Sequence, residues 1–215
     1  MKRHDLVFVN PQDWRALLAR REDLAADALA AAWIDRGWPL IARRALPGEE
    51  RGVALGLPLP PSAGKRRISI VMQPDSIVSI CPPPELRAAR HAAPPAWLPT
   101  IDRLGDLARR HAAELRVFGS LAWQALTGLN YVTDRSDLDL LFRVGRHTDL
   151  ADLAGALAEI EATASMRLDG ELVRDDGAAV NWRELGGEAH ELLVKEIGGV
   201  ALYDRSHFLS ARGPS

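Results

Sequence analysis

Two aspartates interrupt an apolar run near the middle of the chain, and they limit what this region can fold into. Asp137 and Asp139 are separated by one leucine in the run DLDLLF, which ends at Phe142. In an extended strand, side chains two residues apart point to the same side of the sheet, so both carboxylates face one way. Neighbouring carboxylates repel each other and lose hydration beside an apolar core. The spacing therefore predicts a strand that presents two acids to a cation.

A glycine and a serine, Gly119 and Ser120, stand between the apolar segment LRVF and a helical segment. The start of a helix offers unpaired amides and the positive end of the helix dipole to phosphate oxygens. Gly119 permits close approach of the backbone, and we expect Ser120 to cap the helix and donate to a phosphate. The order of strand, Gly-Ser turn, helix and acid-bearing strand predicts a phosphate site beside a cation site.

The bulk composition narrows the class of protein. The 215 residues suffice for one large domain or two small ones with separate cores, and two lobes are expected. The chain has 27 basic and 29 acidic residues, so no general attraction for nucleic acid or a membrane surface is expected. A single cysteine, Cys81, favours a reducing compartment. No stretch approaches the roughly 20 apolar residues of a membrane span, and the first residues lack a signal-peptide core. We expect a cytoplasmic protein.

Short extended segments dominate the first part of the chain. A strand is expected over residues 5–9, followed by a helix that begins at Pro11 with Asn10 as its cap. A second helical pattern occupies residues 23–37. Proline and glycine then separate four extended segments: residues 39–46, 52–59, 66–72 and 75–80.

A proline-rich segment, residues 81–99, follows the last of these strands. Proline lacks an amide donor, so this segment is not expected to form a central strand. We place a domain boundary within it, near Ala93. The predicted fold is α+β with two lobes, an N-terminal domain of residues 1–93 and a C-terminal domain of residues 94–215.

The C-terminal domain alternates helices and strands. A helix capped by Thr100 and a strand over residues 115–118 lead into the Gly-Ser turn. Leucines and alanines at three- and four-residue steps predict an amphipathic helix over residues 148–162. An Asp-Asp-Gly turn at residues 175–177 predicts a hairpin between residues 165–174 and 178–185.

The Gly-Ser turn and the Asp-Leu-Asp strand together resemble the nucleotidyltransferase superfamily typified by DNA polymerase β. The resemblance implies a mixed sheet flanked by helices in the C-terminal lobe. It implies that Gly119 and Ser120 hold a triphosphate while Asp137 and Asp139 bind Mg²⁺ or Mn²⁺. Oxygen-only ligands suit these two ions. The loop TGLNYVTDRS makes the gap between the two motifs longer than is usual in the superfamily.

The superfamily commonly takes a third acid from a neighbouring strand, and the predicted hairpin offers two. Glu171 lies among strand residues in the run GELV and is our preferred third catalytic carboxylate. Asp169 precedes Gly170, so it is expected to belong to a bulge. Asn181 lies on the partner strand, where an amide can ligate or orient but cannot accept a proton. For Glu171 the alternative is an ordinary surface ion pair.

Over almost the whole chain the resemblance becomes more specific. The segments GWPLIARR, GLPLPPSAGKRRI, VFGSLAWQALTGL, SDLDLL, DGELV and GAAVNWREL resemble the malonate decarboxylase holo-acyl-carrier-protein synthase family, also described as phosphoribosyl-dephospho-CoA transferase. The resemblance implies 2'-(5''-triphosphoribosyl)-3'-dephospho-CoA as donor and a serine of the apo acyl carrier protein of malonate decarboxylase as acceptor. Pyrophosphate would leave.

A donor of this size needs a second binding surface. Lys65, Arg66 and Arg67, with Arg43 and Arg44, could bind the dephospho-CoA diphosphate or acidic residues of the carrier. Lys195 could reach a phosphate. The alternative is that these basic side chains are solvated at strand ends.

Two other functions are consistent with the sequence. The same fold could use an ordinary nucleoside triphosphate to modify a protein, an RNA end or a small hydroxyl compound. The chain could also be an inactive module that binds a carrier protein.

Overall fold

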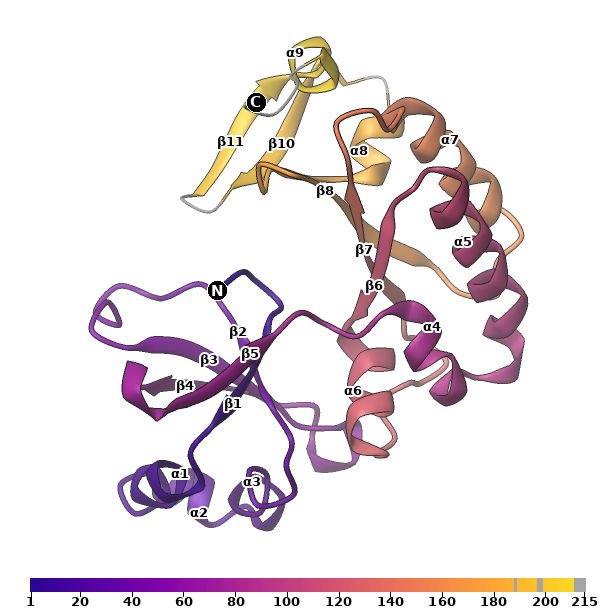
Figure 1. The fold of residues 1–215 in the computed structure, drawn as a ribbon. Coiled ribbons are helices and arrows are strands. Elements are labelled where there is room, and N and C mark those ends of the chain that lie inside the picture. The colour runs from indigo at the N-terminus through magenta and orange to yellow at the C-terminus, as the bar shows by residue number, and fades with distance from the viewer. Residues whose placement is uncertain (188, 197–198, 211–215) are drawn as a thin grey trace. The chain divides into compact units, whose positions relative to one another are not determined.

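The computed structural model describes residues 1–187, 189–196 and 199–210. The chain divides into two compact units (Figure 1). Unit 1 consists of Met1–Pro83 with Leu129–Tyr131, and unit 2 consists of Pro84–Gly128 with the residues from Val132 onward. Each unit contains helices and a sheet, which confirms a two-lobed α+β fold.

The division at Pro83 precedes the boundary expected near Ala93. Helix α4 (Leu86–Ala89) packs against α5 (Leu98–Arg110), α6 (Gly119–Thr127) and β6 (Glu114–Phe118), which all belong to unit 2. Much of the proline-rich segment is therefore part of the second unit, where several of its apolar side chains are buried. Leu86 and Ala89, for example, are 2% and 0% exposed.

Unit 1 is built on an antiparallel sheet with the strand order β4-β3-β2-β1-β5. The strands are β1 (Leu6–Val9), β2 (Leu40–Ala42), β3 (Val53–Pro58), β4 (Arg67–Met72) and β5 (Ile77–Cys81). Short 3-10 turns, η1 (Pro61–Ala63) and η2 (Pro74–Ser76), precede β4 and β5. These strands lie within the five extended segments expected from the sequence, apart from one residue at the end of β5.

Three helices follow β1 in unit 1: α1 (Pro11–Leu18), α2 (Glu22–Ala25) and α3 (Ala28–Ala31). Asn10 caps α1 as predicted, because its side chain accepts a hydrogen bond from the Gln12 amide at 2.8 Å. The helical pattern over 23–37 forms two short helices rather than one. Asp27 interrupts it by capping α3, since its side chain accepts from two amides at the start of that helix.

Unit 2 is built on a sheet with the strand order β11-β10-β9-β8-β7-β6. The strands are β6 (Glu114–Phe118), β7 (Leu138–Val144), β8 (Leu168–Arg174), β9 (Ala179–Asn181), β10 (Glu191–Glu196) and β11 (Gly199–Asp204). Strands β7 and β8 are parallel and the other neighbours are antiparallel, so the sheet is mixed as predicted.

The longer helices of unit 2 are α5 (Leu98–Arg110), α6 (Gly119–Thr127) and α7 (Leu150–Glu161). Short helices α8 (Trp182–Gly186) and α9 (Arg205–Ser210) and the turns η3 (Arg90–Ala92) and η4 (Pro95–Trp97) complete the unit. Helices α5 and α7 lie side by side over one face of the sheet (Figure 1). They bury alternate residues of β7 in the core of the unit: Leu138, Leu140, Phe142 and Val144. The intervening residues of β7, including Asp139, belong to the other face.

Two local expectations in unit 2 are wrong. Thr100 does not cap its helix, because α5 begins at Leu98 with Pro99 in its first turn, where the missing amide costs nothing. Thr100 is instead buried within the helix, at 5% exposed. The sequence WREL was expected to continue the second hairpin strand, but it forms α8 immediately after Asn181.

The loop between α6 and β7 contributes to the other unit. Residues 129–131 of this loop group with unit 1, where the Tyr131 hydroxyl donates to the Pro58 carbonyl at 2.7 Å. No helix in the described part of the chain is long and apolar enough to cross a membrane.

Candidate active site

The Gly-Ser turn and the acid-bearing strand meet at the start of α6. Phe118, the last residue of β6, pairs with Asp139 of β7, and Gly119 follows with a φ of +63°. A Cβ atom on Gly119 would lie 1.8 Å from Oδ2 and 2.6 Å from Cγ of Asp139. The carboxylate thus occupies the space that a side chain at position 119 would need. Glycine is required here both for this contact and for the positive φ.

The first turn of α6 places amide groups beside this carboxylate. The first amides of a helix have no partner within the helix, so they are available to an anion. Ser120 is the second residue of the helix and not its cap, which corrects the sequence-based expectation. Phe118 occupies the cap position and makes no capping hydrogen bond with its side chain. Ser120 is half-buried in this first turn.

The second acid of the motif precedes Asp139 by two residues in the chain, and a third carboxylate faces Asp139 from the next strand. Asp137 is half-buried and directly precedes β7, so the strand begins one residue later than predicted and carries only Asp139 of the two motif acids. Asp169 of β8 is the register partner of Asp139 in the parallel β7–β8 pair. Adjacent strands are about 4.8 Å apart, so the two aspartates are neighbours on one face. The β7–β8 register has no shift from Leu138 to Val144. The bulge expected at Asp169 is therefore absent.

The structure brings Glu171 and Lys195 together. Glu171 lies two residues after Asp169 on the same face of β8 and is 8% exposed. The Lys195 Nζ atom on β10 lies 2.5 Å from the Glu171 Oε1 atom. These two residues were predicted separately, as a catalytic acid and a phosphate-binding base. They form an ion pair within the face that also carries Asp139 and Asp169.

Asn181 contacts the other hairpin acid. Its Nδ2 atom donates to Oδ1 of Asp169 at 3.1 Å, while its Oδ1 accepts from the Arg183 amide at 2.9 Å. Asn181 therefore bonds to Asp169 and caps α8 at the same time. The sequence had left ligation and orientation open for this residue, and the hydrogen bond to Asp169 favours orientation.

The donor set limits how a metal could bind. Across the residues that the structure describes, no three His, Cys, Asp or Glu side chains come close enough to hold an ion by themselves. Mg²⁺ is usually bound through one or two carboxylates together with substrate phosphates and water. The carboxylates of Asp137 and Asp139, beside a helix start that suits phosphate, fit that kind of site.

The predicted basic residues of the first lobe belong to unit 1, whereas the acids belong to unit 2. Lys65, Arg66 and Arg67 are exposed around the start of β4. Arg66 forms an ion pair with Asp27 and donates to the Ala63 carbonyl. Arg67 is the register partner of Pro58 at the end of the β3–β4 pair.

Arg43, also considered for substrate binding, has a structural role. It forms a two-pronged ion pair with Glu49, with both N–O distances at 2.7 Å, and donates to the Leu55 carbonyl. Hydrogen bonds from Arg43 and from the Leu46 amide lower the pKa of Glu49 to about 2. These contacts hold the segment between β2 and β3 against the sheet.

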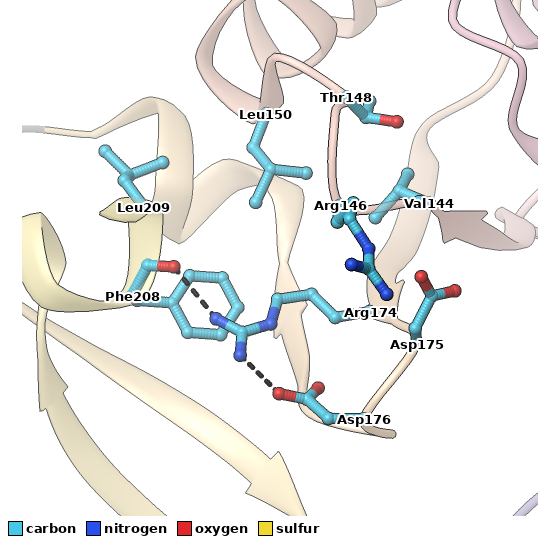
Figure 2. Close-up of a pocket in the computed structure, with 10 residues that line it drawn as sticks. Val144, Arg146, Thr148, Leu150, Arg174, Asp175, Asp176, Phe208 and Leu209 are labelled. Atoms are coloured by element: carbon cyan, nitrogen blue, oxygen red, sulfur yellow. Dashed lines mark hydrogen bonds and ion pairs between the residues drawn. The ribbon is translucent and has the colours of Figure 1, made fainter. Parts of the chain in front are cut away.

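A separate hollow lies at the far end of β7 and β8 (Figure 2). It is lined by Val144 and Arg174, the last residues of these strands, whereas Asp139 and Asp169 lie near the strand starts. The Arg174 guanidinium donates to the Phe208 carbonyl at 3.0 Å, pairs with Asp176 and lies over the Phe208 ring. This hollow is therefore distinct from the candidate site.

A Gly-Ser turn packed against an aspartate of a mixed sheet is the arrangement expected for the nucleotidyltransferase class of transferases. Two family models divide the chain between them: the phosphoribosyl-dephospho-CoA transferase MdcG N-terminal domain matches residues 2–83, and the MdcG C-terminal domain matches residues 85–206. The chain belongs to this phosphoribosyl-dephospho-CoA transferase family and is an enzyme.

Relatives with the same description span nearly the whole chain. A phosphoribosyl-dephospho-CoA transferase of Bradyrhizobium diazoefficiens is 59% identical over 97% of this chain and 92% of its own length. One from Xanthomonas campestris pv. campestris is 38% identical over 92% of this chain and 96% of its own length. One from Azotobacter vinelandii is 28% identical over 93% of this chain and 91% of its own length. No solved structure matches the chain.

Proposed function

We propose that the enzyme transfers phosphoribosyl-dephospho-CoA from 2'-(5''-triphosphoribosyl)-3'-dephospho-CoA to a serine of the malonate decarboxylase apo acyl carrier protein. The serine Oγ would attack the phosphorus nearest the ribose. The bond from that phosphorus to the bridging oxygen would break, and pyrophosphate would leave. The family match supports the transferred group. The observation that supports the chemistry is the contact of the Asp139 carboxylate with the backbone of Gly119.

That contact brings together the two sites that phosphoryl transfer needs, one for the triphosphate and one for the cation. The α6 amides and Ser120 would bind the triphosphate, and Asp137 and Asp139 would hold Mg²⁺ or Mn²⁺ against it. The ion, when bound, would neutralise charge on the phosphates and on the leaving pyrophosphate. The residues of the chain would hold the reacting groups in position. Such positioning accounts for much of the rate in reactions of this kind. The single cysteine favours a cytoplasmic location for this activity.

The positions of the hairpin acids favour Asp169 over Glu171 as the third carboxylate. Asp169 is in register with Asp139, whereas Glu171 is opposite Leu141, two residues further along β7. Glu171 also forms an ion pair with Lys195. We infer that Asp169 accepts the serine proton or joins the cation site. Glu171 would hold the Lys195 ammonium in place for a donor phosphate.

Substitution of each acid tests these assignments. Purified enzyme, Mg²⁺, the triphosphoribosyl donor and apo carrier protein are incubated, and the carrier mass is measured by mass spectrometry. Wild type should add one prosthetic group per carrier and release pyrophosphate. Asp139→Asn should abolish transfer, and Asp169→Asn should reduce it by about 100-fold or more, the usual scale for loss of a proton-transferring group.

Glu171→Gln is the matched comparison on the same strand. We expect it to weaken donor binding through Lys195 while leaving more activity than Asp169→Asn. The reverse order would return the catalytic role to Glu171. Full activity of Asp139→Asn would refute the site. Transfer from ordinary nucleoside triphosphates in place of the dephospho-CoA donor would refute the proposed substrate. Carrier binding by calorimetry without Mg²⁺-dependent donor binding would indicate an inactive module.

A further inference from the structure

Three consecutive residues at the start of α8 contact three consecutive residues at the start of β8. Asn181 bonds to the side chain of Asp169, Trp182 packs on Gly170, and Arg183 bonds to the backbone of Leu168. The central residue of the contacted run Leu168–Gly170 is Asp169, the acid that faces Asp139.

Arg183 and Glu161 hold both backbone polar groups of Leu168. The Glu161 Oε1 atom accepts from the Leu168 amide at 2.8 Å, and Arg183 Nη2 donates to the Leu168 carbonyl at 2.7 Å. Arg183 and Glu161 also form a two-pronged ion pair, which lowers the pKa of Glu161 against the effect of its burial. The end of α7 and the start of α8 are thereby joined to the residue that precedes Asp169.

The indole of Trp182 packs on Gly170, the residue that follows Asp169. A Cβ atom on Gly170 would lie 3.3 Å from Trp182 Cδ1, so the ring packs directly on the strand backbone. Trp182 is 4% exposed, and the Arg183 guanidinium lies over its ring, with Cζ 4.5 Å from the ring centroid. The strand cannot move away from α8 without opening a cavity.

We propose that Asn181, Trp182 and Arg183 form a positioning clamp that sets the carboxylate of Asp169 opposite Asp139 and so sets the cation affinity of the site. The inference rests on the proposed function and takes the second of the two roles given there for Asp169, in which its carboxylate joins the cation site. In this scheme Asn181 holds Oδ1 of Asp169 and so fixes where its other oxygen points. Arg183 with Glu161 holds the backbone from which that side chain extends.

The chain contains a matched control for Asn181. Asn10 and Asn181 both precede a helix and both accept a hydrogen bond from the amide two residues later, at 2.8 and 2.9 Å. Only Asn181 also donates to a carboxylate. Serine caps helices about as well as asparagine. Asn181→Ser therefore keeps the cap and removes the contact with Asp169, whereas Asn10→Ser only exchanges one cap for another.

The experiment measures cation binding as well as transfer. Mn²⁺ binding in the presence of inorganic pyrophosphate is followed by electron paramagnetic resonance, and the Mg²⁺ concentration for half-maximal transfer is determined. Asn181→Ser should weaken Mn²⁺ binding and raise the Mg²⁺ requirement by about tenfold, as is typical when a group that orients a ligand is lost. Asn10→Ser should leave both quantities unchanged, and circular dichroism should show both variants folded.

A second pair of variants tests the backbone part of the clamp. Arg183→Lys keeps the charge but cannot bond to Glu161 and to the Leu168 carbonyl in the same geometry. Arg90→Lys is its control, because Arg90 makes an equivalent two-pronged pair with Asp102, at 2.8 and 2.9 Å, elsewhere in unit 2. Mn²⁺ binding should weaken and the Mg²⁺ requirement should rise for Arg183→Lys, and both quantities should stay unchanged for Arg90→Lys.

The outcomes separate the clamp from the proposed function. If Asp139→Asn loses Mn²⁺ binding but Asn181→Ser binds Mn²⁺ as wild type does, the clamp is refuted and the site stands. If the variants at 181 and 183 alter Mn²⁺ binding while wild type fails to use the triphosphoribosyl donor, the clamp is supported and the proposed substrate is refuted. If wild type binds no Mn²⁺ with pyrophosphate, the clamp and the cation site are both refuted.

Discussion

Position 119 shows how one side chain can dictate the identity of another residue. Asp139 occupies the space where a Cβ atom on residue 119 would be, and the backbone there has a positive φ. The residue must therefore be glycine, although the sequence explained it only by close approach of a phosphate. The same geometry puts the carboxylate within contact of the helix start, where the proposed phosphate binds.

A pair of alanine substitutions at the two ends of α6 tests this point. Gly119 and Gly128 both have positive φ, +63° and +72°, but a Cβ on Gly128 meets nothing within 4 Å. Each substitution should cost about 1–2 kcal/mol of stability from backbone strain, measured by urea denaturation. Only Gly119→Ala should displace Asp139 and reduce transfer, by about 100-fold. Equal activities of the two variants would contradict the proposed role of Asp139.

The hairpin acids show what residue-level prediction from sequence lacked. Glu171 and Asp169 both lie on one face of a predicted strand, and the sequence favoured Glu171 because of its apolar neighbours. The choice between them depends on which residue of β7 each acid faces, and on Lys195, which is 24 residues from Glu171. Neither fact is encoded in the local pattern around the acids.

At the scale of elements, local signals located most of the helices and strands. Asn10 caps α1, and the apolar periodicity found α7 within the predicted range. The sequence missed the last two strands, β10 and β11, although Leu192 and Val194 alternate as buried residues, at 0% exposed, with Leu193 at 43%. It also extended a strand through Trp182, where the cap at Asn181 starts a helix. Capping was the informative signal in that segment.

The cap of α7 gives a prediction for an element that supports the site without touching it. The Asp149 side chain accepts from the amides of Ala151 and Asp152, both at 3.0 Å. Asp149→Ala should destabilise unit 2 by about 1 kcal/mol in urea denaturation, because two amides lose their acceptor. Asp149→Ser should restore most of that loss. Transfer activity at temperatures where the protein is folded should stay at the wild-type level, and a loss there would contradict a purely structural role.

At the scale of the molecule, the chain forms two units with separate apolar cores. The core of unit 1 includes Trp14, Trp33 and Leu55, and the core of unit 2 includes Leu104, Phe142 and Leu157. The predicted basic residues belong to the first unit and the acids to the second. The loop between α6 and β7 crosses this division, because Leu129–Tyr131 belongs to unit 1.

The Arg43–Glu49 pair provides a pH test that is specific to unit 1. The pKa of Glu49 falls from 4.5 to about 2 in the folded protein, so the pair stabilises the fold above pH 4.5 and loses this effect as the pH falls toward 2. Glu49→Gln should therefore lower the thermal midpoint above pH 4.5, and the difference from wild type should close toward pH 2. Hydrogen exchange should increase in β2 and β3 but not in β7 and β8.

A control and a contrary outcome complete this test. Glu159→Gln, at an exposed position of α7, should leave the midpoint unchanged at every pH. A difference between Glu49→Gln and wild type that persists unchanged at pH 2 would show that lost packing, rather than lost charge, destabilises the variant.

The sequence by itself determined the two-lobed α+β class, most element positions and the pairing of a Gly-Ser turn with the strand that carries Asp139. These follow from side-chain periodicity, from capping and from the backbone properties of glycine and proline, all of which act over a few residues. Tertiary structure alone decided that Asp169 faces Asp139, that Lys195 pairs with Glu171, and that residues 168–170 are held by residues 181–183. Each of these depends on strand register and helix packing, which are set by the burial of whole faces rather than by any local run of residues.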